Sequence, residues 1–225
     1  MSSTVVVVVT APLAGPLDDA PLIKAEGRES LLRAVELFVN RDGVSRVLLV
    51  VPPSRAEEYK RKVGGHLSFM GVRIVTGGET FVEQLAAARP QVEAGTTHVL
   101  VHDAARPAVP YTDLDALTAA AARHPVVALA VPTTGPLLRV GSVPGPAQWS
   151  TDRVAQIVTP VAFTLAAIDE VVATGGLPSS LQWIEASPLN VRCGQASPGM
   201  VKAMIGLLPK PKVKAPSSPF EEAQW

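Results

Sequence analysis

Five short runs of apolar, largely β-branched residues recur along the first part of the chain, at 4–10, 45–51, 72–75, 97–101 and 126–131. The runs are continuous rather than alternating, which is typical of parallel strands covered on both faces. Segments with helical spacing lie between them, at 30–39, 55–62, 80–88 and 114–123, and Ser30 and Ser54 are expected to cap the first two. The alternation predicts an α/β fold with a three-layer, doubly wound, mostly parallel sheet.

Two segments interrupt this rhythm. Residues 133–149 are rich in Pro and Gly, which predicts an extended arm that protrudes from the domain. Because such an arm cannot bury itself, we expect it to pack on a second subunit and form a homodimer. Residues 209–225 are rich in Pro, Lys and Ser, which predicts a mobile tail. The length of 225 residues then favours a single domain over 1–208.

Composition excludes several classes of protein. Twenty basic residues balance twenty acidic ones, so the overall charge gives no reason to expect a nucleic-acid partner. The single cysteine, Cys193, rules out an internal disulfide framework and fits a reducing compartment. The apolar run at 5–9 is too short to span a bilayer and lacks the basic flank of a signal peptide. We therefore expect a cytoplasmic protein without a membrane partner.

The segment 101–107, Val-His-Asp-Ala-Ala-Arg-Pro, carries the most informative candidate chemistry. It follows an apolar run and ends in a turn forced by Pro107 and Pro110, so its acid and its arginine are expected just past the carboxyl end of a strand. Ligands bind at that edge of open α/β sheets. Asp103 can hold a divalent cation there, and Arg106 can hold a phosphate. The alternative is an Asp–Arg pair that only orders the turn.

Further segments, taken with 101–107, occur in an order that identifies a family resemblance. They are Val50-Val51-Pro52-Pro53, Val75-Thr76-Gly77-Gly78, Asp152-Arg153, Thr159-Pro160-Val161-Ala162-Phe163 and Leu189-Asn190-Val191-Arg192. The chain resembles the 2-C-methyl-D-erythritol 4-phosphate cytidylyltransferase (IspD) family over roughly residues 4–208. The resemblance implies a fold similar to that of the nucleotide-diphospho-sugar transferases.

The resemblance also implies a reaction and a set of site residues. In that family, a sugar-alcohol phosphate attacks the α-phosphorus of CTP and pyrophosphate leaves, with Mg²⁺ and basic side chains stabilising the charge, as a step of non-mevalonate isoprenoid biosynthesis. The implied partners are therefore CTP and a polyol phosphate. By position, the resemblance gives catalytic roles to Arg153 and Arg192. Neither basic residue of the family's loop is in place, and Lys24, the nearest one and slightly displaced from the family's Pro-Lys position, takes the third catalytic role. The resemblance also places Gly15, Gly77, Gly78, Asp103, Ala104, Arg106 and Thr159 at the substrates and makes Asp103 the metal ligand.

The loop after the first strand departs from the family pattern. The family has a glycine-rich loop with Arg and then Pro-Lys, whereas this chain reads Thr-Ala-Pro-Leu-Ala-Gly-Pro-Leu-Asp-Asp from Thr10. Pro12 and Pro16 remove amide donors, and Asp18 and Asp19 repel a polyphosphate. Losing two charge-assisted contacts is expected to weaken triphosphate stabilisation by on the order of several kcal/mol.

Other positions depart from the family as well. Phe81 stands where the family has Arg, Gln84 where it has Ser, and Gly135-Pro136 where it has an Asp-Thr pair that contacts the acceptor. Arg192 replaces a lysine, which keeps the charge but changes the geometry.

These departures leave more than one hypothesis open. The first is a cytidylyltransferase with a diverged loop and impaired activity. The second is an inactive homologue that acts as a binding or regulatory partner. In either case we expect Arg106, Arg153, Thr159 and Arg192 to bind a small phosphate anion. A third hypothesis, an interaction module that uses the 209–225 tail, rests on composition alone.

Overall fold

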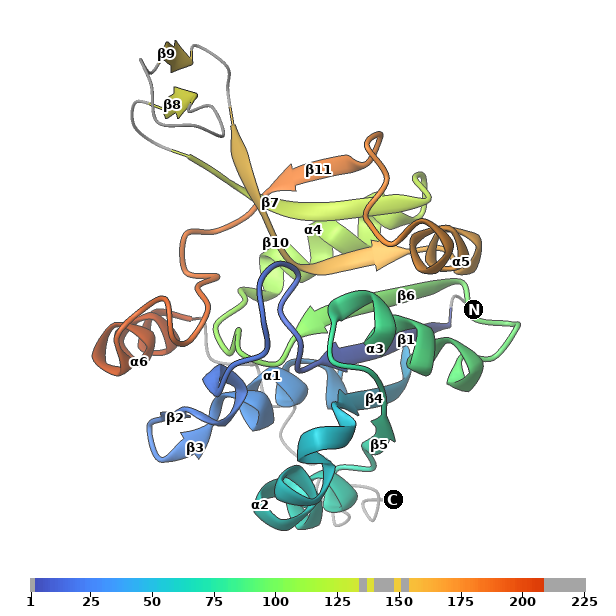
Figure 1. Ribbon diagram of the computed structural model, residues 1–225, viewed down its shortest axis with the longest axis vertical. Helices are drawn as coiled ribbons and strands as arrows, with labels where there is room; N and C mark the ends of the chain where they lie inside the picture. The colour runs from blue at the N-terminus through green and yellow to red at the C-terminus, as the bar shows by residue number, and fades with distance from the viewer. Residues whose placement is uncertain (1–2, 134–136, 140–147, 151–153, 209–225) are drawn as a thin grey trace, which may run out of the picture.

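The fold is built on a seven-stranded sheet, and the computed structural model describes residues 3–133, 137–139, 148–150 and 154–208. The seven strands are β1 (Thr4–Val9), β4 (Val44–Val51), β5 (Arg73–Thr76), β6 (His98–Asp103), β7 (Val126–Pro132), β10 (Ala155–Phe163) and β11 (Gln182–Glu185). Their order across the sheet is β11-β7-β10-β6-β1-β4-β5 (Figure 1). β10 runs antiparallel to both of its neighbours, and the other pairings in this sheet are parallel. The predicted mostly parallel sheet is thus confirmed.

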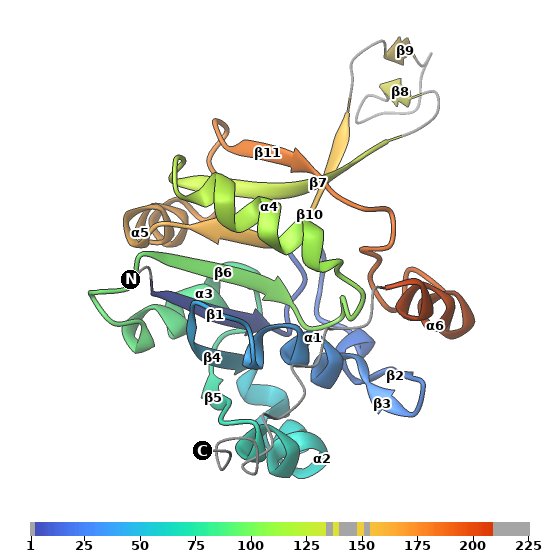
Figure 2. The same cartoon turned by 180° about the vertical axis from the view of Figure 1, so that it is seen from behind.

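Helices cover both faces of the sheet. They are α1 (Ser30–Val39), α2 (Ala56–Phe69), α3 (Phe81–Ala88), α4 (Tyr111–Ala121), α5 (Leu165–Thr174) and α6 (Pro198–Leu207). α1, α2 and α4 pack on one face, and α3 and α5 pack on the other (Figures 1 and 2). Val6 and Val8 of β1 contribute to the first core, whereas Val5 and Val7 contribute to the second. Both faces of β1 are buried, which explains why its sequence is apolar throughout.

Short elements connect the layers. They are η1 (Ala20–Leu22), η2 (Pro53–Arg55), η3 (Arg89–Gln91) and the hairpin of β2 (Lys24–Ala25) and β3 (Arg28–Glu29). This hairpin lies between β1 and α1 in the chain and packs against α6. A small third core of Ala20, Ala25, Ala105, Cys193 and Val201 joins these parts.

The predicted helices form, but their ends differ from expectation. The second runs on to Phe69 because Tyr59, Val63 and Leu67 continue its buried stripe across Gly64-Gly65. The capping predictions were wrong: Ser30 is the first residue within α1, and its hydroxyl donates to the Ala104 carbonyl at 3.1 Å.

Ser54 lies within η2, and the residue that precedes α2 is Arg55, whose side chain makes no capping bond. Each serine was assigned as a cap from local pattern, whereas the side chain of Ser30 bonds to a segment 74 residues away.

The predicted arm contains a two-stranded hairpin. β8 (Leu137–Arg139) pairs antiparallel with β9 (Gln148–Ser150), beyond the ends of β7 and β10 and apart from the main sheet (Figure 1). The rest of the arm at 134–136, 140–147 and 151–153, and the 209–225 tail, lie outside the described residues. Among the described residues, no helix combines the length and the apolar character needed to cross a membrane.

Close packing explains the two glycines, Gly77 and Gly78, in the turn between β5 and α3. A Cβ atom on Gly77 would lie 2.6 Å from Val50 Cγ1 and 2.8 Å from Ala87 Cβ. A Cβ atom on Gly78 would lie 2.2 Å from Glu83 Cβ. Both glycines therefore let the chain pass closely from β5 into α3, whatever they do for a ligand.

We expect Gly77→Ala to lower the free energy of unfolding by about 1–3 kcal/mol, because two core neighbours must move to admit the methyl group. Gly65→Ala in α2 is the matched control, since its new Cβ meets nothing within 4 Å. In a helix that change should stabilise the protein by about 0.5–1 kcal/mol. Urea unfolding of the two variants measures both effects, and equal midpoints would contradict the packing argument.

Candidate functional site

The candidate site lies where the parallel strands β1, β4 and β6 end. Ala104, directly after β6, donates its amide to the Val9 carbonyl at the end of β1 at 2.8 Å. The segment from Asp103 to Arg106 is thereby held against the start of the loop that follows β1. A polar set is buried at this edge, namely Asp103, Arg106, Thr159, Asn190 and Arg192, and is called the buried polar cluster below.

Asp103 is the centre of the buried polar cluster. Its Oδ1 accepts the Ala105 amide at 2.8 Å, and its Oδ2 accepts Arg192 Nε at 2.7 Å. Its own amide donates to Thr159 Oγ1 at 2.9 Å. Burial raises the pKa of the Asp103 carboxyl, and the Arg192 guanidinium opposes this effect without cancelling it.

Arg106 is held by main-chain and side-chain groups of the segment before α6. Its Nη1 donates to the Asn190 carbonyl at 2.8 Å, and Asn190 Nδ2 donates to the Thr159 carbonyl at 2.8 Å. Arg106 and Asn190 also line a hollow of about 240 Å³ together with Gln156 and Gln195. The hollow therefore offers a guanidinium and several amides to a small polar ligand.

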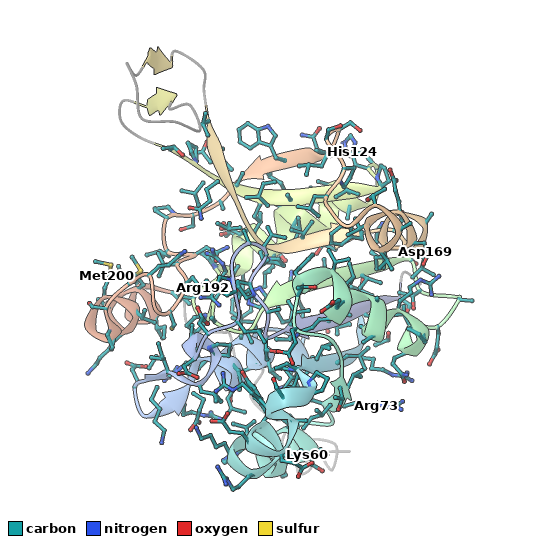
Figure 3. All side chains as sticks on the ribbon, in the orientation of Figure 1. Lys60, Arg73, His124, Asp169, Arg192 and Met200 are labelled. Atoms are coloured by element: carbon teal, nitrogen blue, oxygen red, sulfur yellow. The ribbon has the colours of Figure 1, made fainter. Side chains whose placement is uncertain are left out.

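Arg192 connects the buried polar cluster to the loop after β1, and Figure 3 shows its side chain beside that loop. Its Nη1 and Nη2 donate to the two carboxylate oxygens of Asp18 at 2.5 and 3.0 Å. Two carboxylates therefore share this one guanidinium. Burial alone would lower the pKa of Arg192, but Asp18 and Asp103 outweigh burial and raise it.

A second arginine holds the same loop. Arg55 lies at the end of η2, after β4, and pairs with Asp19 at 2.7 Å. Its Nη1 also donates to the Asp18 carbonyl at 3.1 Å, and its Nε pairs with Glu58 at 2.8 Å. Both acids of the loop, which were predicted only to repel a polyphosphate, therefore bind cations of this chain.

The base of the loop is fixed by Gln84 of α3. Its fully buried amide oxygen accepts the amides of Thr10 and Ala11 at 2.9 and 3.1 Å. Its amide nitrogen, Nε2, donates to the Gly78 carbonyl at 3.1 Å. Amide donors at the start of the loop are thus used within the protein. The side chain that replaces the family's serine joins the Gly77-Gly78 turn to β1.

His102 packs against the buried polar cluster and contacts two of its members, Arg106 and Thr159. It is completely buried, with Nε2 2.9 Å from the Arg106 carbonyl oxygen and Nδ1 3.3 Å from Thr159 Oγ1. Phe38 packs edge-to-face on its ring, with centroids 5.3 Å apart. Burial lowers the pKa of His102 to about 3, so the imidazole is neutral and serves to orient its neighbours.

The structure brings together most of the residues that the sequence singled out at β6 and beyond. Those brought together are Asp103, Ala104, Arg106, Thr159 and Arg192. Gly15 lies in the loop after β1 with φ +96°, and Gly77 and Gly78 lie at the turn into α3.

Two predicted catalytic residues are not among them. Lys24 projects from the β2–β3 hairpin with 64% of its side chain exposed, and its ammonium lies 3.6 Å from Glu29. It makes no described bond to the buried polar cluster. Arg153 lies outside the described residues.

Sequence reasoning missed several members of the site. Asn190, His102, Arg55 and Gln84 hold the site residues in place, and Asp18 binds Arg192 directly. A signal existed for Asn190 and His102, because both lie inside segments that resemble the family. For Arg55, the only signal is its position just after a strand.

The Asp103 carboxylate, the predicted metal ligand, is engaged within the protein in this arrangement. Both carboxylate oxygens of Asp103 already accept hydrogen bonds, and one of the donors is a guanidinium. Within the described residues, no group of three or more His, Cys, Asp or Glu side chains is placed to hold a metal ion. The Mg²⁺ ligand role of Asp103 stays a prediction.

A mostly parallel sheet with this cluster at its carboxyl edge matches a nucleotidyltransferase-like α/β protein. A sequence model of the family "2-C-methyl-D-erythritol 4-phosphate cytidylyltransferase", IspD, matches residues 18–202. The chain belongs to this family.

Curated relatives carry the same family name. The protein from Rhodopirellula baltica is 32% identical over 125 residues, which is 51% of each chain. The protein from Streptomyces avermitilis is 32% identical over 136 residues, which is 58% of this chain and 54% of the relative. The chain thus spans about half the length of the curated relatives it matches.

Solved structures confirm the fold. The 4-diphosphocytidyl-2C-methyl-D-erythritol synthase of Anaerococcus prevotii superposes with a TM-score of 0.71 at 15% identity, over 91% of this chain and 95% of that one. A second structure of a synthase with that name gives a TM-score of 0.70 at 21% identity, over 90% of this chain and 99% of that one.

The buried imidazole predicts how stability depends on pH. Between pH 6.5 and about 3, the unfolded chain binds a proton at His102 that the folded chain excludes, so stability falls as the pH falls through this window. From pH 6.5 to about 5, the expected loss is about 2 kcal/mol in the free energy of unfolding.

Denaturant unfolding at several pH values measures this loss. His102→Gln, which keeps a donor toward the Arg106 carbonyl, should flatten the slope, whereas the exposed His66→Gln should leave it unchanged. A slope that survives in His102→Gln would show that other groups cause it.

Proposed function

We propose that this chain transfers a cytidylyl group from CTP to a polyol phosphate, with 2-C-methyl-D-erythritol 4-phosphate as the first candidate acceptor, and that the reaction is slow. The observation that carries the proposal is the buried polar cluster, which lies within the part of the chain that matches the family. Slow turnover is proposed because the loop after β1 offers carboxylates where a triphosphate needs cations.

The hollow beside Arg106 suits the acceptor. A polyol phosphate needs a cation for its phosphate and polar groups for its hydroxyls. Arg106, Gln156, Asn190 and Gln195 line the hollow, which has about 240 Å³ of space. A guanidinium forms paired bonds with a phosphate, and the amides can both donate to and accept from hydroxyls.

In the proposed step, an oxygen of the acceptor phosphate attacks the α-phosphorus of CTP. A new phosphorus–oxygen bond forms, the bond from the α-phosphorus to the bridging oxygen breaks, and pyrophosphate carries away the electron pair. The residues of this chain contribute position and charge: Arg106 holds the acceptor, and Arg192 stabilises negative charge that develops on the transferring phosphate.

The weak half of the site is the triphosphate half. Pro12 and Pro16 carry no amide proton, and Gln84 uses the amides of Thr10 and Ala11. A triphosphate therefore finds fewer backbone donors than a glycine-rich loop would supply.

A pyrophosphate-release assay with CTP and 2-C-methyl-D-erythritol 4-phosphate, with and without Mg²⁺, tests the proposal. We expect slow turnover that Arg192→Gln lowers about 100-fold, because the variant loses a charged donor at the reacting phosphate. Arg89→Gln is the matched control, since it breaks a surface pair between the end of α3 and Asp169 of α5 and should not alter the rate.

Circular dichroism of Arg192→Gln separates loss of activity from loss of fold. If the folded wild-type protein neither turns over nor binds CTP at millimolar concentration, the enzyme proposal fails. The alternative, an inactive homologue that acts as a binding partner, then takes its place.

We also propose that the arm forms a homodimer. β8 and β9 pair with each other and lie apart from the main sheet (Figure 1). A two-stranded hairpin is marginally stable by itself in water, so a second subunit is the simplest support for it. Light scattering at high concentration should give twice the mass of 23.5 kDa, and a monomer would contradict the proposal.

A further inference from the structure

The loop after β1 ends in two adjacent acids that bind different arginines. Asp18 makes a two-oxygen pair with Arg192, whereas Asp19 pairs with Arg55. Arg192 belongs to the buried polar cluster, and Arg55 lies at the end of η2, directly before α2. The two acids therefore have the same charge and lie side by side in the chain, but only Asp18 contacts the cluster.

The contact made by Asp18 has the geometry of a bound phosphate. Its two oxygens take both terminal nitrogens of Arg192, and Nε of the same guanidinium donates to Asp103. A phosphate binds an arginine through the same pair of terminal nitrogens. With Asp18 in place, no terminal donor pair of Arg192 is left for a ligand.

Asp18 is the partner of Arg192 that can leave. The Asp103 side chain is 3% exposed and lies on β6, while the Asp18 side chain is 43% exposed and lies in a loop. Burial opposes ionisation of Asp18, but bonds from Arg192 and the Ala20 amide lower its pKa below the ordinary value. Asp18 is therefore an anion at neutral pH, and its carboxylate can occupy the position of a phosphate at Arg192.

The charge at the site leads to the same conclusion. Asp18 and Asp103 carry two negative charges, and Arg106 and Arg192 carry two positive ones. A phosphate dianion that enters this neutral set gains little attraction. If it displaces Asp18, the remaining three groups carry a net positive charge.

We infer that the Asp18 carboxylate is an internal competitor for the phosphate position at Arg192, so that phosphate binds only when Asp18 and its loop move away. The inference rests on the proposed function for the class of ligand, a phosphate monoester or anhydride. Asp18 then sets the affinity of the site, because the apparent affinity for phosphate is proportional to the fraction of molecules in which the loop is open, and Asp18 keeps that fraction low.

Calorimetric titration with inorganic phosphate tests this inference, using the full chain without CTP. Asp18→Asn removes the charge and keeps an oxygen that can accept the Ala20 amide, as Asp18 Oδ1 does at 3.0 Å. We expect it to bind phosphate at least about 10-fold more tightly than the wild-type protein does. Asp19→Asn, which removes the same charge one residue away, should change the affinity less than about 2-fold.

Hydrogen exchange gives a second readout. Phosphate should speed exchange of the Leu22 amide in the wild-type protein, because this amide donates to the Asp19 carbonyl at 2.9 Å and the end of the loop moves when Asp18 leaves Arg192. In Asp18→Asn, exchange should already be fast without phosphate.

Several results would overturn the inference. Equal tightening by Asp18→Asn and Asp19→Asn would show a general charge effect, and unchanged affinity in Asp18→Asn would show no competition. Phosphate binding that leaves loop exchange unaltered would place the anion elsewhere. Failure of cytidylyl transfer would not alter these measurements, because none of them uses CTP or an acceptor.

Discussion

The carboxyl edge of this sheet depends on the buried ion pair between Asp103 and Arg192. Asp103 ends the central strand β6, and Arg192 arrives 89 residues later from the segment before α6. Two charges removed from water need nearly complete hydrogen bonding, since an unpaired one costs several kcal/mol. The Ala105 amide and Asp18 supply the remaining bonds, and no described buried side-chain nitrogen or oxygen is left without a partner. The pair therefore ties β6, the loop after β1 and the C-terminal segment into one unit.

Local pattern predicts the parts of the fold in which each residue's environment repeats. β1 and β4 are covered on both faces, so their apolar runs predict the ends of both strands to within one residue. β10 carries a break in register between Val158 and Val161, at Thr159-Pro160. Its sequence shows no continuous apolar run, so local pattern did not predict this strand, which pairs with β6 on one side and β7 on the other. The antiparallel direction of β10 depends on where the arm returns the chain, which no local periodicity records.

The site shows the same division between local and distant information. Asp103 and Arg106 were predicted because a strand end and a proline turn place them together. The roles of Asp18 and Gln84 depend on partners 174 and 74 residues away, so composition suggested repulsion for one and nothing for the other. The glycines at 77 and 78 illustrate the converse, because packing against Val50 and Glu83 explains them without a nucleotide.

Substituting acids for bases in one loop changes the site in a way that a simple loss of contacts does not. A loop that had only lost its cations would leave Arg192 open to any phosphate. Here the loop supplies the missing anion itself, so the guanidinium is satisfied, the cluster is neutral and the free protein is ordered at its own binding site. A phosphate ligand must then exchange places with a carboxylate, and the free-energy difference between two similar ion pairs is small. Ligand binding and loop position are therefore coupled. By linkage, phosphate shifts the loop toward its open position by the same factor by which opening the loop strengthens phosphate binding.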